Sequence, residues 1–487
     1  MGLRRLLLLI ATAFGVLWFA VEGTSALGLL ICLFNNRAVS NMLIRCVLDL
    51  SFQLFRLASP LTVPLLASLL FGSILAPLFA CLRRLSRRKK AEWRWQEACW
   101  TICDRSQLLH RALLVSLLGI LVVETLLLTL VGADLVAVDD SYYVGRLEEM
   151  ADPIAARNVL ISNPHRVYLL ILYLLRGALG LPLILTVKLG AVLLVPFLSG
   201  CVYLFVASGT NSRSLAILSS IFSAISVQVS VGLMSGIYSN WLAFALLHAF
   251  YCVLTKALKR LSTKLILSIF LLSLLIMLTH VWTWWVVMGS LALNQLISLI
   301  CSLGEHDSSR ADPVVGRTLL CVLVSAIPML VILGAGGLEL YLVPNGILSF
   351  LAVENCLRIA ETLAEVLKLY VRGFLIVPAV YFLSLLSLLS FHKVRSIFGR
   401  VLGSWIGSVS AFALFAWPWY EWRVLYLFPF HVASAVGTVT VLGVFDRYFG
   451  LRDEYARYVK ALFLGALILM LLNYLLRCIG ALLGFPI

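Results

Sequence analysis

Apolar stretches long enough to cross a lipid bilayer recur along the whole length of this 487-residue chain. Uninterrupted apolar runs of about 18 or more residues are typical of transmembrane helices, because backbone polar groups in lipid must be satisfied within the segment. The runs are continuous rather than alternating, which disfavours a β-barrel. Composition agrees, since 62% of the residues are hydrophobic and only 13% are charged, against roughly 25% charged in soluble domains. The sequence therefore predicts an all-α polytopic membrane protein.

The basic residues are gathered in short clusters between the apolar runs. The formal net charge is +15, but this distribution follows the positive-inside rule and argues against nucleic-acid binding. The strongest cluster, Arg83–Lys90, fixes its own segment as cytoplasmic. Orientation of the remaining segments follows by alternation, and most lysine and arginine residues then fall on the cytoplasmic side.

We predict about thirteen spans on this basis. They cover residues 6–34, 46–82, 112–132, 182–207, 214–231, 240–256, 265–280, 281–301, 318–333, 373–391, 401–417, 424–445 and 461–481. Two long loops, 133–181 and 334–372, fall on the external side. Each is expected to carry an interfacial helix, near 164–179 and 354–372, the second with Leu357, Ala360, Leu363, Leu367 and Tyr370 on one face.

Three regions follow from this map. Residues 1–111 form an N-terminal transmembrane hairpin with a basic cytoplasmic linker, residues 112–445 a transmembrane core, and residues 446–487 a cytoplasmic loop and the last span. The first apolar run reads as a retained span, because no small-residue cleavage site follows it. Abundant Leu, Val and Arg with little Asn or Gln favours a thermophilic prokaryote, so we expect an integral protein of a prokaryotic plasma membrane.

The loop after the third predicted span carries the clearest candidate chemistry. It reads VDDSYYVGRLEEMADP and places Asp139 and Asp140 just outside the membrane. Adjacent carboxylates can bind a divalent cation such as Mg²⁺ or Mn²⁺ through oxygen ligands, and one of them can act as a general base. The alternative is a solvated loop in which Asp140 or Ser141 caps a helix that begins near Tyr142.

This loop resembles a known family. Asp139-Asp140-Ser141-Tyr142-Tyr143, with Arg146-Leu147 and Glu149-Met150, is similar to the first external loop of the GT-C membrane glycosyltransferases. That group includes oligosaccharyltransferase catalytic subunits, protein O-mannosyltransferases and lipid A aminoarabinose transferases. In it, one or two acids follow an outward-running span and precede a membrane-parallel helix. Asn163-Pro164-His165-Arg166 resembles the His-Pro-Pro-type opening of that helix in several such families, with one proline and with His and Pro in reversed order.

Three further stretches match the group in the right order. Leu278–Trp284 looks like a Thr-His-aromatic signature at an external helix end, and Ser235–Asn240 occupies an external turn. Tyr420–Phe430 resembles the Glu-x-Arg-Tyr-Leu…Pro stretch that opens a late span. The resemblance covers roughly residues 112–445, so the N-terminal hairpin lies outside it.

The resemblance implies a glycosyltransferase with an extracytoplasmic active site. Its donor would be a sugar on a polyprenyl phosphate, its acceptor a lipid, glycan or protein, and its partners membrane lipids. Asp139 and Asp140 would serve as base or metal ligands, and Arg423, His280 and His165 would bind the donor phosphate, which a guanidinium matches bidentately. The substrate pocket would be lined by Tyr142, Tyr143, Trp282, Tyr420 and Glu421.

Other interpretations stay open. Arg423 could be an interfacial anchor beside Trp417, Trp419 and Trp422, and His280 a satisfied interfacial histidine. The chain could instead be a transporter or flippase of a lipid-linked or amphipathic substrate, which would concentrate polar residues near mid-membrane. A non-catalytic scaffold would lack a cavity that joins Asp140 to Arg423. Charged residues in or near spans are functional candidates unless they pair or snorkel: Glu22, Asp49, Arg56, Glu124 and Lys188.

Overall fold

The computed structural model of the chain describes most of the predicted core. It covers residues 16–30, 59–86, 137, 139–303, 313–334, 358–370, 377–388, 396–416, 418–449 and 454–482, with a few isolated residues between 13 and 121. All regular structure within these ranges is helical, and no β-strand occurs in them. The prediction of an all-α protein is confirmed.

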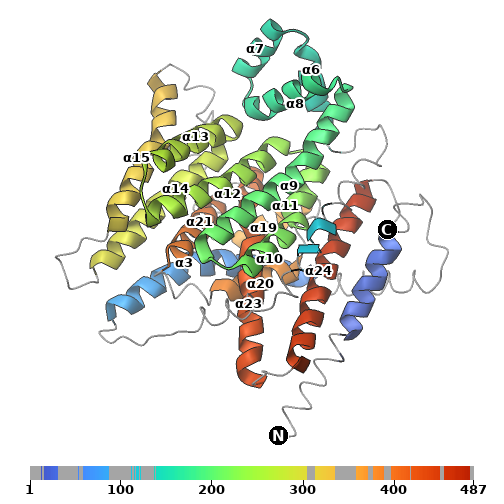
Figure 1. Ribbon diagram of the computed structural model, residues 1–487, viewed down its shortest axis with the longest axis vertical. Helices are drawn as coiled ribbons and strands as arrows, with labels where there is room; N and C mark the ends of the chain where they lie inside the picture. Colours follow the sequence, from blue (N-terminus) through green and yellow to red (C-terminus); the bar gives the residue numbers. More distant parts are fainter. Residues whose placement is uncertain are drawn as a thin grey trace.

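The helices form one bundle with a smaller helical group at one end (Figure 1). In the first half they are η1 (Ser59–Leu61), α3 (Thr62–Ser86), α6 (Asp140–Glu149), α7 (Pro153–Ser162), α8 (Arg166–Leu179), α9 (Leu183–Thr210), α10 (Arg213–Ala224), α11 (Val227–Ser235) and α12 (Tyr238–Lys259). In the second half they are α13 (Thr263–Thr279), α14 (Val281–Leu303), α15 (Pro313–Gly334), α19 (Ile359–Glu365), η2 (Val366–Tyr370), α20 (Pro378–Leu388), α21 (Ile397–Phe415), α22 (Pro418–Leu425), α23 (Phe430–Phe449) and α24 (Glu454–Leu482).

Eight of the described helical segments are long and apolar enough to cross a membrane, which makes the chain a polytopic membrane protein. They coincide with predicted spans and lie at Ser59–Ala76, Leu183–Thr210, Arg213–Ser235, Tyr238–Lys259, Val281–Ile300, Pro313–Val331, Ile397–Phe415 and Tyr458–Gly480. Four more predicted spans coincide with shorter apolar helices, at Val16–Leu30, Thr263–Thr279, Pro378–Leu388 and Phe430–Gly443. The predicted span 112–132 lies largely outside the described residues, so the count of thirteen stays a prediction.

Three helices of the first predicted external loop, α6, α7 and α8, make up the group at the end of the bundle, which we call the cap (residues 139–179; Figure 1). α8 matches the interfacial helix expected at 164–179. Asp152 begins α7, because its carboxylate accepts hydrogen bonds from the backbone N–H of Ile154 and Ala155 at 2.8 and 2.9 Å and Pro153 suits the first helical turn.

The cap and the basic connections lie at opposite ends of α12. Asp139 donates its backbone N–H to the carbonyl of Ser235, just before α12 begins. At the other end, Lys259 Nζ donates to the carbonyl of Ser208 at 2.7 Å, and Arg317 donates to the carbonyls of Leu258 and Lys259. The predicted alternation of the spans accounts for this separation.

Two of the predicted spans are interrupted rather than continuous. One breaks between α10 and α11, where Ser226 caps α11, and the other between α22 and α23 at residues 426–429. Gln228 Nε2 donates to the Phe428 carbonyl at 2.7 Å, and Trp405 Nε1 donates to the Leu427 carbonyl at 3.0 Å. Irregular backbone is tolerated inside a membrane protein only where other groups satisfy it in this way. The expectation of one helix through 424–445 was wrong at this break.

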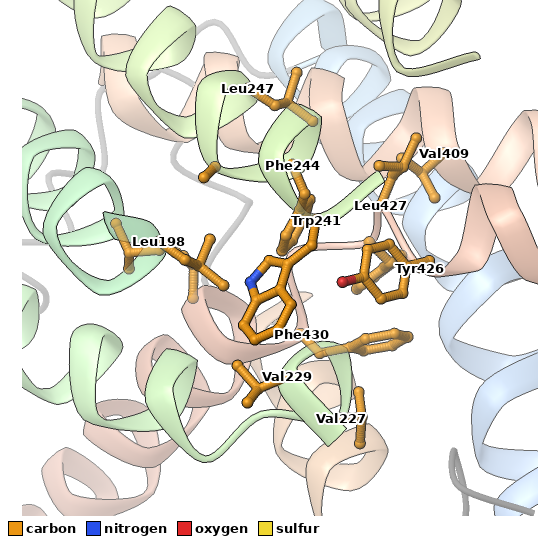
Figure 2. Packing of buried hydrophobic residues seen from close by; sticks show 14 of the residues in the cluster. Leu198, Val227, Val229, Trp241, Phe244, Leu247, Val409, Tyr426, Leu427 and Phe430 are labelled. Carbon is orange, nitrogen blue, oxygen red and sulfur yellow. The ribbon is translucent and has the colours of Figure 1, made fainter. Parts of the chain in front are cut away.

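Aromatic side chains fill the centre of the bundle around these breaks. Figure 2 shows Trp241 beside Phe244, Tyr426 and Phe430, all of them buried. Because lipid gives little hydrophobic drive between helices, close packing carries the association. At Gly437 of α23 an added Cβ would stand 1.9 Å from the Leu383 carbonyl oxygen of α20, so these two helices require glycine to approach.

The helix Val16–Leu30 packs on α24, at the other end of the sequence. Asn473 Nδ2 donates to both the carboxylate and the carbonyl of Glu22, and the Trp18 and Phe463 rings lie 6.1 Å apart. Glu22 therefore has an intramembrane partner, which explains this acid by pairing. Asp49, Arg56 and Glu124 lie outside the described residues.

Candidate functional site

The two adjacent acids at the start of α6 have different environments. Asp140 is buried, and its carboxylate accepts hydrogen bonds from Tyr238 Oη at 2.8 Å and from the Ala137 N–H at 3.0 Å. Asp139 precedes it as the N-cap residue, is only partly buried, and makes no side-chain cap hydrogen bond. Asp140 thus holds α6 on α12, whereas the Asp139 carboxylate is the more accessible of the two.

Tyrosines of the cap and of α12 surround this pair. The Tyr143 hydroxyl forms a hydrogen bond with Ser239 Oγ at 3.1 Å and accepts another from the Ser239 backbone N–H at 3.3 Å. Its ring centroid lies 5.2 Å from that of Tyr168 and 5.5 Å from that of Tyr238. Burial raises the pKa of Tyr143 and of Tyr168. These phenols therefore stay neutral and form a rigid wall.

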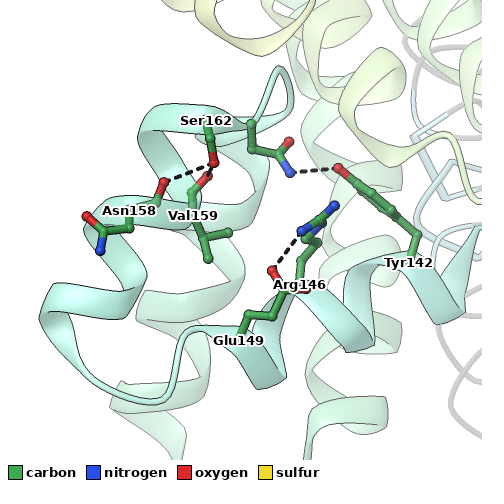
Figure 3. A network of polar contacts seen from close by, with 7 residues as sticks. Tyr142, Arg146, Glu149, Asn158, Val159 and Ser162 are labelled. Carbon is green, nitrogen blue, oxygen red and sulfur yellow. Dashed lines mark hydrogen bonds and ion pairs between the residues drawn. The ribbon is translucent and has the colours of Figure 1, made fainter.

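Tyr142 lies on a different side of α6. It accepts a 2.7 Å hydrogen bond from Asn163 Nδ2, and the Arg146 guanidinium lies 5.5 Å from its ring centroid (Figure 3). Asn163 Oδ1 in turn accepts from the His165 N–H at 2.8 Å. Tyr142 thereby fixes the turn between α7 and α8, and with it the position of His165.

The two predicted phosphate-binding histidines come from separate helix ends. His165 begins α8, and a backbone hydrogen bond joins its imidazole to Thr279; its Nδ1 is buried with no partner among the described residues. His280 lies between α13 and α14, and its Nδ1 pairs with Thr283 Oγ1 at 2.9 Å. Both rings are therefore oriented by the polypeptide around them.

Arg423 is the residue that links these groups. Burial and, to a lesser extent, the positive charge of Arg423 together lower the pKa of His165 to about 4. Burial, His165 and Arg423 together hold the pKa of His280 well below its usual value. Burial raises the pKa of Asp139, which Arg423 opposes and Asp140 reinforces. A charge shifts the pKa of another group appreciably only when the two are close. Asp139, His165 and His280 therefore all lie near Arg423, and the four residues converge at the cap end of the bundle.

The charge states of this site follow from those shifts. Both imidazoles are neutral at neutral pH, so they can offer hydrogen bonds to a phosphate but no charge. Arg423 is partly buried, and its guanidinium lies 5.3 Å from the neighbouring Trp422 ring centroid. One guanidinium, one acid and two neutral imidazoles therefore define the site (Asp139, His165, His280 and Arg423), which we call the Asp139–Arg423 site.

Glu421 lies two residues before Arg423 in α22, and its environment differs from that of the arginine. Its side chain is fully buried, and neither carboxyl oxygen has a hydrogen-bond partner within the described ranges. Burial, with Glu365 nearby, raises its pKa to about 9. Glu421 is consequently a neutral acid at neutral pH. This burial was not evident from its sequence position among interfacial tryptophans.

The second predicted interfacial helix lies beside α22. α19 and η2 bury one face, formed by Ile359, Thr362, Leu363, Val366 and Leu367, and both elements contact α22. Leu363 and Leu367 are buried on this face as predicted, whereas Ala360 is exposed, so the prediction was wrong for Ala360. Leu357 and the side chain of Tyr370 lie outside the described residues.

The remaining two predicted pocket residues are Trp282 and Tyr420. Trp282 is partly buried two residues after His280, while the Tyr420 side chain falls outside the described residues. No group of three or more His, Cys, Asp or Glu side chains suited to a metal occurs in the part of the chain that the structure describes. Within the Asp139–Asp140 pair, both Asp140 oxygens already accept hydrogen bonds, so Asp139 is the better placed of the two for Mg²⁺ or Mn²⁺. Mg²⁺ bound by one carboxylate typically takes its other ligands from phosphate and water.

Sequence reasoning assigned no individual site role to several residues that build this site. Tyr238, Tyr168 and Asn163 all support the predicted residues directly. Polar residues inside the bundle were also missed: His248 Nε2 and His431 Nε2 lie 2.9 Å apart, joining α12 to α23. Lone polar residues in apolar runs were the available signal for this pair.

No protein-family model matches the chain, and no curated protein matches it.

Proposed function

We propose that this chain is a membrane glycosyltransferase that moves a sugar from a polyprenyl-phosphate donor to a lipid, glycan or protein acceptor. The observation that carries the proposal is the convergence of Asp139 and Arg423, which come from distant parts of the sequence. An acid for the acceptor and a cation for the leaving phosphate are the two groups that this reaction needs. A GT-C-like fold on an extracytoplasmic face is part of the same proposal.

The reaction assigns each residue one task. An acceptor hydroxyl oxygen attacks the anomeric carbon, and its proton passes to Asp139. The bond from that carbon to the phosphate oxygen breaks, and the electron pair leaves with the polyprenyl phosphate. Arg423 stabilises the released charge bidentately. His165 and His280, both neutral, orient the phosphate by hydrogen bonds. A divalent cation held by Asp139 and the substrate would neutralise further phosphate charge.

The burial of Asp139 favours its task as a base. A carboxyl with an ordinary pKa is a weak base at neutral pH, and a raised pKa brings it closer to the operating range. Arg423 opposes that rise, because its positive charge favours the ionised form of Asp139, the form that accepts a proton. The tyrosine wall behind α6 keeps this geometry fixed, which general acid–base catalysis requires.

The test is sugar transfer by purified protein in liposomes. Polyprenyl monophosphate donors with different labelled sugars are supplied with membrane lipid extract as acceptor, and labelled product is separated by chromatography. Wild-type protein is expected to form product, and Asp139→Asn and Arg423→Ala to lose it. Glu148→Gln, an exposed acid on the same helix, is the matched control. No product with any donor, or full activity in both site variants, would overturn the proposal.

Transport is the second candidate function, and specific observations favour it. The His248–His431 pair joins the candidate span Tyr238–Lys259 to the shorter apolar helix Phe430–Gly443, and the two interrupted helices meet beside it through Gln228 and Phe428. Discontinuous helices near buried polar groups are typical of transporter binding sites. Movement of a fluorescent polyprenyl-phosphate sugar across vesicle membranes without product formation would favour this function over transfer.

A further inference from the structure

An apolar groove runs between α7 and α8 on the cap. It is a cavity of about 400 Å³, lined by Ala156 and Leu160 of α7 and by Leu170 and Tyr173 of α8. This volume lies near the small end of pockets that take small organic ligands, roughly 300–1,000 Å³. We call it the α7–α8 groove. Its lining suits one hydrocarbon chain.

Two arginines also line this apolar groove. Arg157 of α7 is exposed, and no described residue pairs with its guanidinium. The acid closest to it in sequence is Asp152, whose carboxylate is engaged with the amides that begin α7. Arg166 is held at the groove by Nε, which donates to the Asn163 carbonyl at 3.2 Å. A groove that combines an apolar floor with two guanidiniums matches an anionic head on an apolar tail.

The surroundings of the groove suit a bilayer surface. Leu170, Ile171 and Leu174 of α8 are exposed, at 41%, 41% and 59% of their area, and Ile161 of α7 at 58%. Exposed aliphatic side chains beside arginines are typical of helices that lie at the boundary between headgroups and acyl chains. If the cap lies at that boundary, a lipid would reach the groove without leaving the membrane.

The groove adjoins the Asp139–Arg423 site through a short turn. Arg166 lines the groove, while the preceding residue, His165, belongs to the site. Asn163 holds both residues, accepting from the His165 N–H and from Arg166 Nε. A phosphate bound at Arg166 is thus one residue along the chain from the group expected to meet the donor phosphate.

We infer that the α7–α8 groove binds a polyprenyl monophosphate, with its phosphate on Arg157 and Arg166 and the first part of its single chain along Leu160 and Leu170. The groove is then the place from which the lipid-linked donor passes to the Asp139–Arg423 site. The choice of this lipid over other anionic lipids rests on the proposed function and on the room for one chain. The two arginines and the apolar floor carry the binding itself.

Binding is tested without any transfer reaction. A fluorescent short-chain polyprenyl monophosphate is titrated into purified full-length protein in detergent, with diacyl phosphatidylglycerol and inorganic phosphate as competitors. Arg157→Glu reverses the charge at the groove, and Leu170→Trp fills the groove. Each variant is expected to weaken binding at least tenfold. Arg157→Lys keeps the charge and is expected to retain most of it. Ile154→Trp, on an exposed position of α7 outside the groove lining, and Arg213→Glu, at the start of α10, are the matched controls.

The outcomes separate this inference from the proposed function. Unchanged binding in both Arg157→Glu and Leu170→Trp overturns the groove, even if sugar transfer is intact. Equal competition by diacyl phosphatidylglycerol overturns the single-chain assignment, and equal competition by inorganic phosphate overturns the role of the apolar floor. Binding that depends on both positions in a protein that transfers no sugar supports the groove and defeats the glycosyltransferase proposal.

Discussion

Tyr238 donates a 2.8 Å hydrogen bond to Asp140, and this contact fastens the first cap helix to the start of α12. Asp140 is buried, so the bond is shielded from water. It fixes the adjacent Asp139 relative to the helices that carry His280 and Arg423. Asp140 therefore positions the cap, and the proposed chemistry is left to its neighbour Asp139.

Asp140 is expected to matter for stability. Tyr238→Phe removes one hydrogen-bond donor from the buried Asp140 carboxylate and should cost about 1–3 kcal/mol. Asp140→Asn should destabilise the protein comparably, whereas Glu148→Gln on the exposed side of α6 should not. Thermal melting in detergent measures this. An unchanged melting temperature in both Tyr238→Phe and Asp140→Asn would show that this bond does not hold the cap.

Gly236 is required where the chain turns beneath Asp139. Its φ is +71°, and an added Cβ would stand 2.9 Å from the Asp139 backbone nitrogen. Gly236→Ala is expected to destabilise by about 1–3 kcal/mol through backbone strain and to displace Asp139. Gly145→Ala in α6 is the control, since an added Cβ there has no neighbour within 4 Å and helix propensity favours alanine by up to about 1 kcal/mol. Equal changes in melting temperature for Gly236→Ala and Gly145→Ala would contradict the requirement for glycine at position 236.

Glu421 gives a pH dependence with a defined sign. Its pKa rises from the ordinary 4.5 to about 9 in the folded protein, so the folded state keeps a proton that the unfolded state releases between these values. Stability therefore falls as pH rises from about 5 to 9. Glu421→Gln, which is neutral throughout, should lose this slope, and melting curves in detergent at several pH values measure it. Parallel wild-type and Glu421→Gln profiles would refute the protonated state.

The His248–His431 pair should behave as one unit. His248 Nδ1 pairs with the Phe244 carbonyl at 2.8 Å, so its Nε2 accepts the proton of His431 Nε2. Either single change to Phe leaves a buried nitrogen without a partner and should destabilise by about 1–3 kcal/mol. The double variant should cost less than the sum of the two. Additive losses in a double-mutant cycle would mean that the two rings do not interact.

Hydrophobic run length made the helical bundle predictable from the sequence. Of the predicted spans, those at 182–207, 240–256 and 281–301 coincide with α9, α12 and α14, because long apolar runs admit one outcome in lipid. The breaks beside Ser226 and Phe428 were not predictable in this way. They depend on side chains from elsewhere in the bundle, Gln228 and Trp405, that satisfy the freed backbone.

The candidate site was predictable as residues but not as an arrangement. Charge in an apolar chain drew notice to Asp139, Asp140 and Arg423, and the span map placed them at one end. The different environments of the two acids depend on Tyr238, which no local pattern connects to them. The neutral state of Glu421 depends on burial by the fold, which sequence spacing does not report.

The most direct test of the central claim is a double-mutant cycle on sugar transfer at Asp139 and Arg423. We expect Asp139→Asn and Arg423→Ala each to lower the transfer rate by about 10²-fold or more while the protein stays folded. Because the two groups act on one transition state, the double variant should be little slower than the worse single variant. Wild-type rates in the single variants, or strictly multiplicative losses in the double variant, would contradict a shared site.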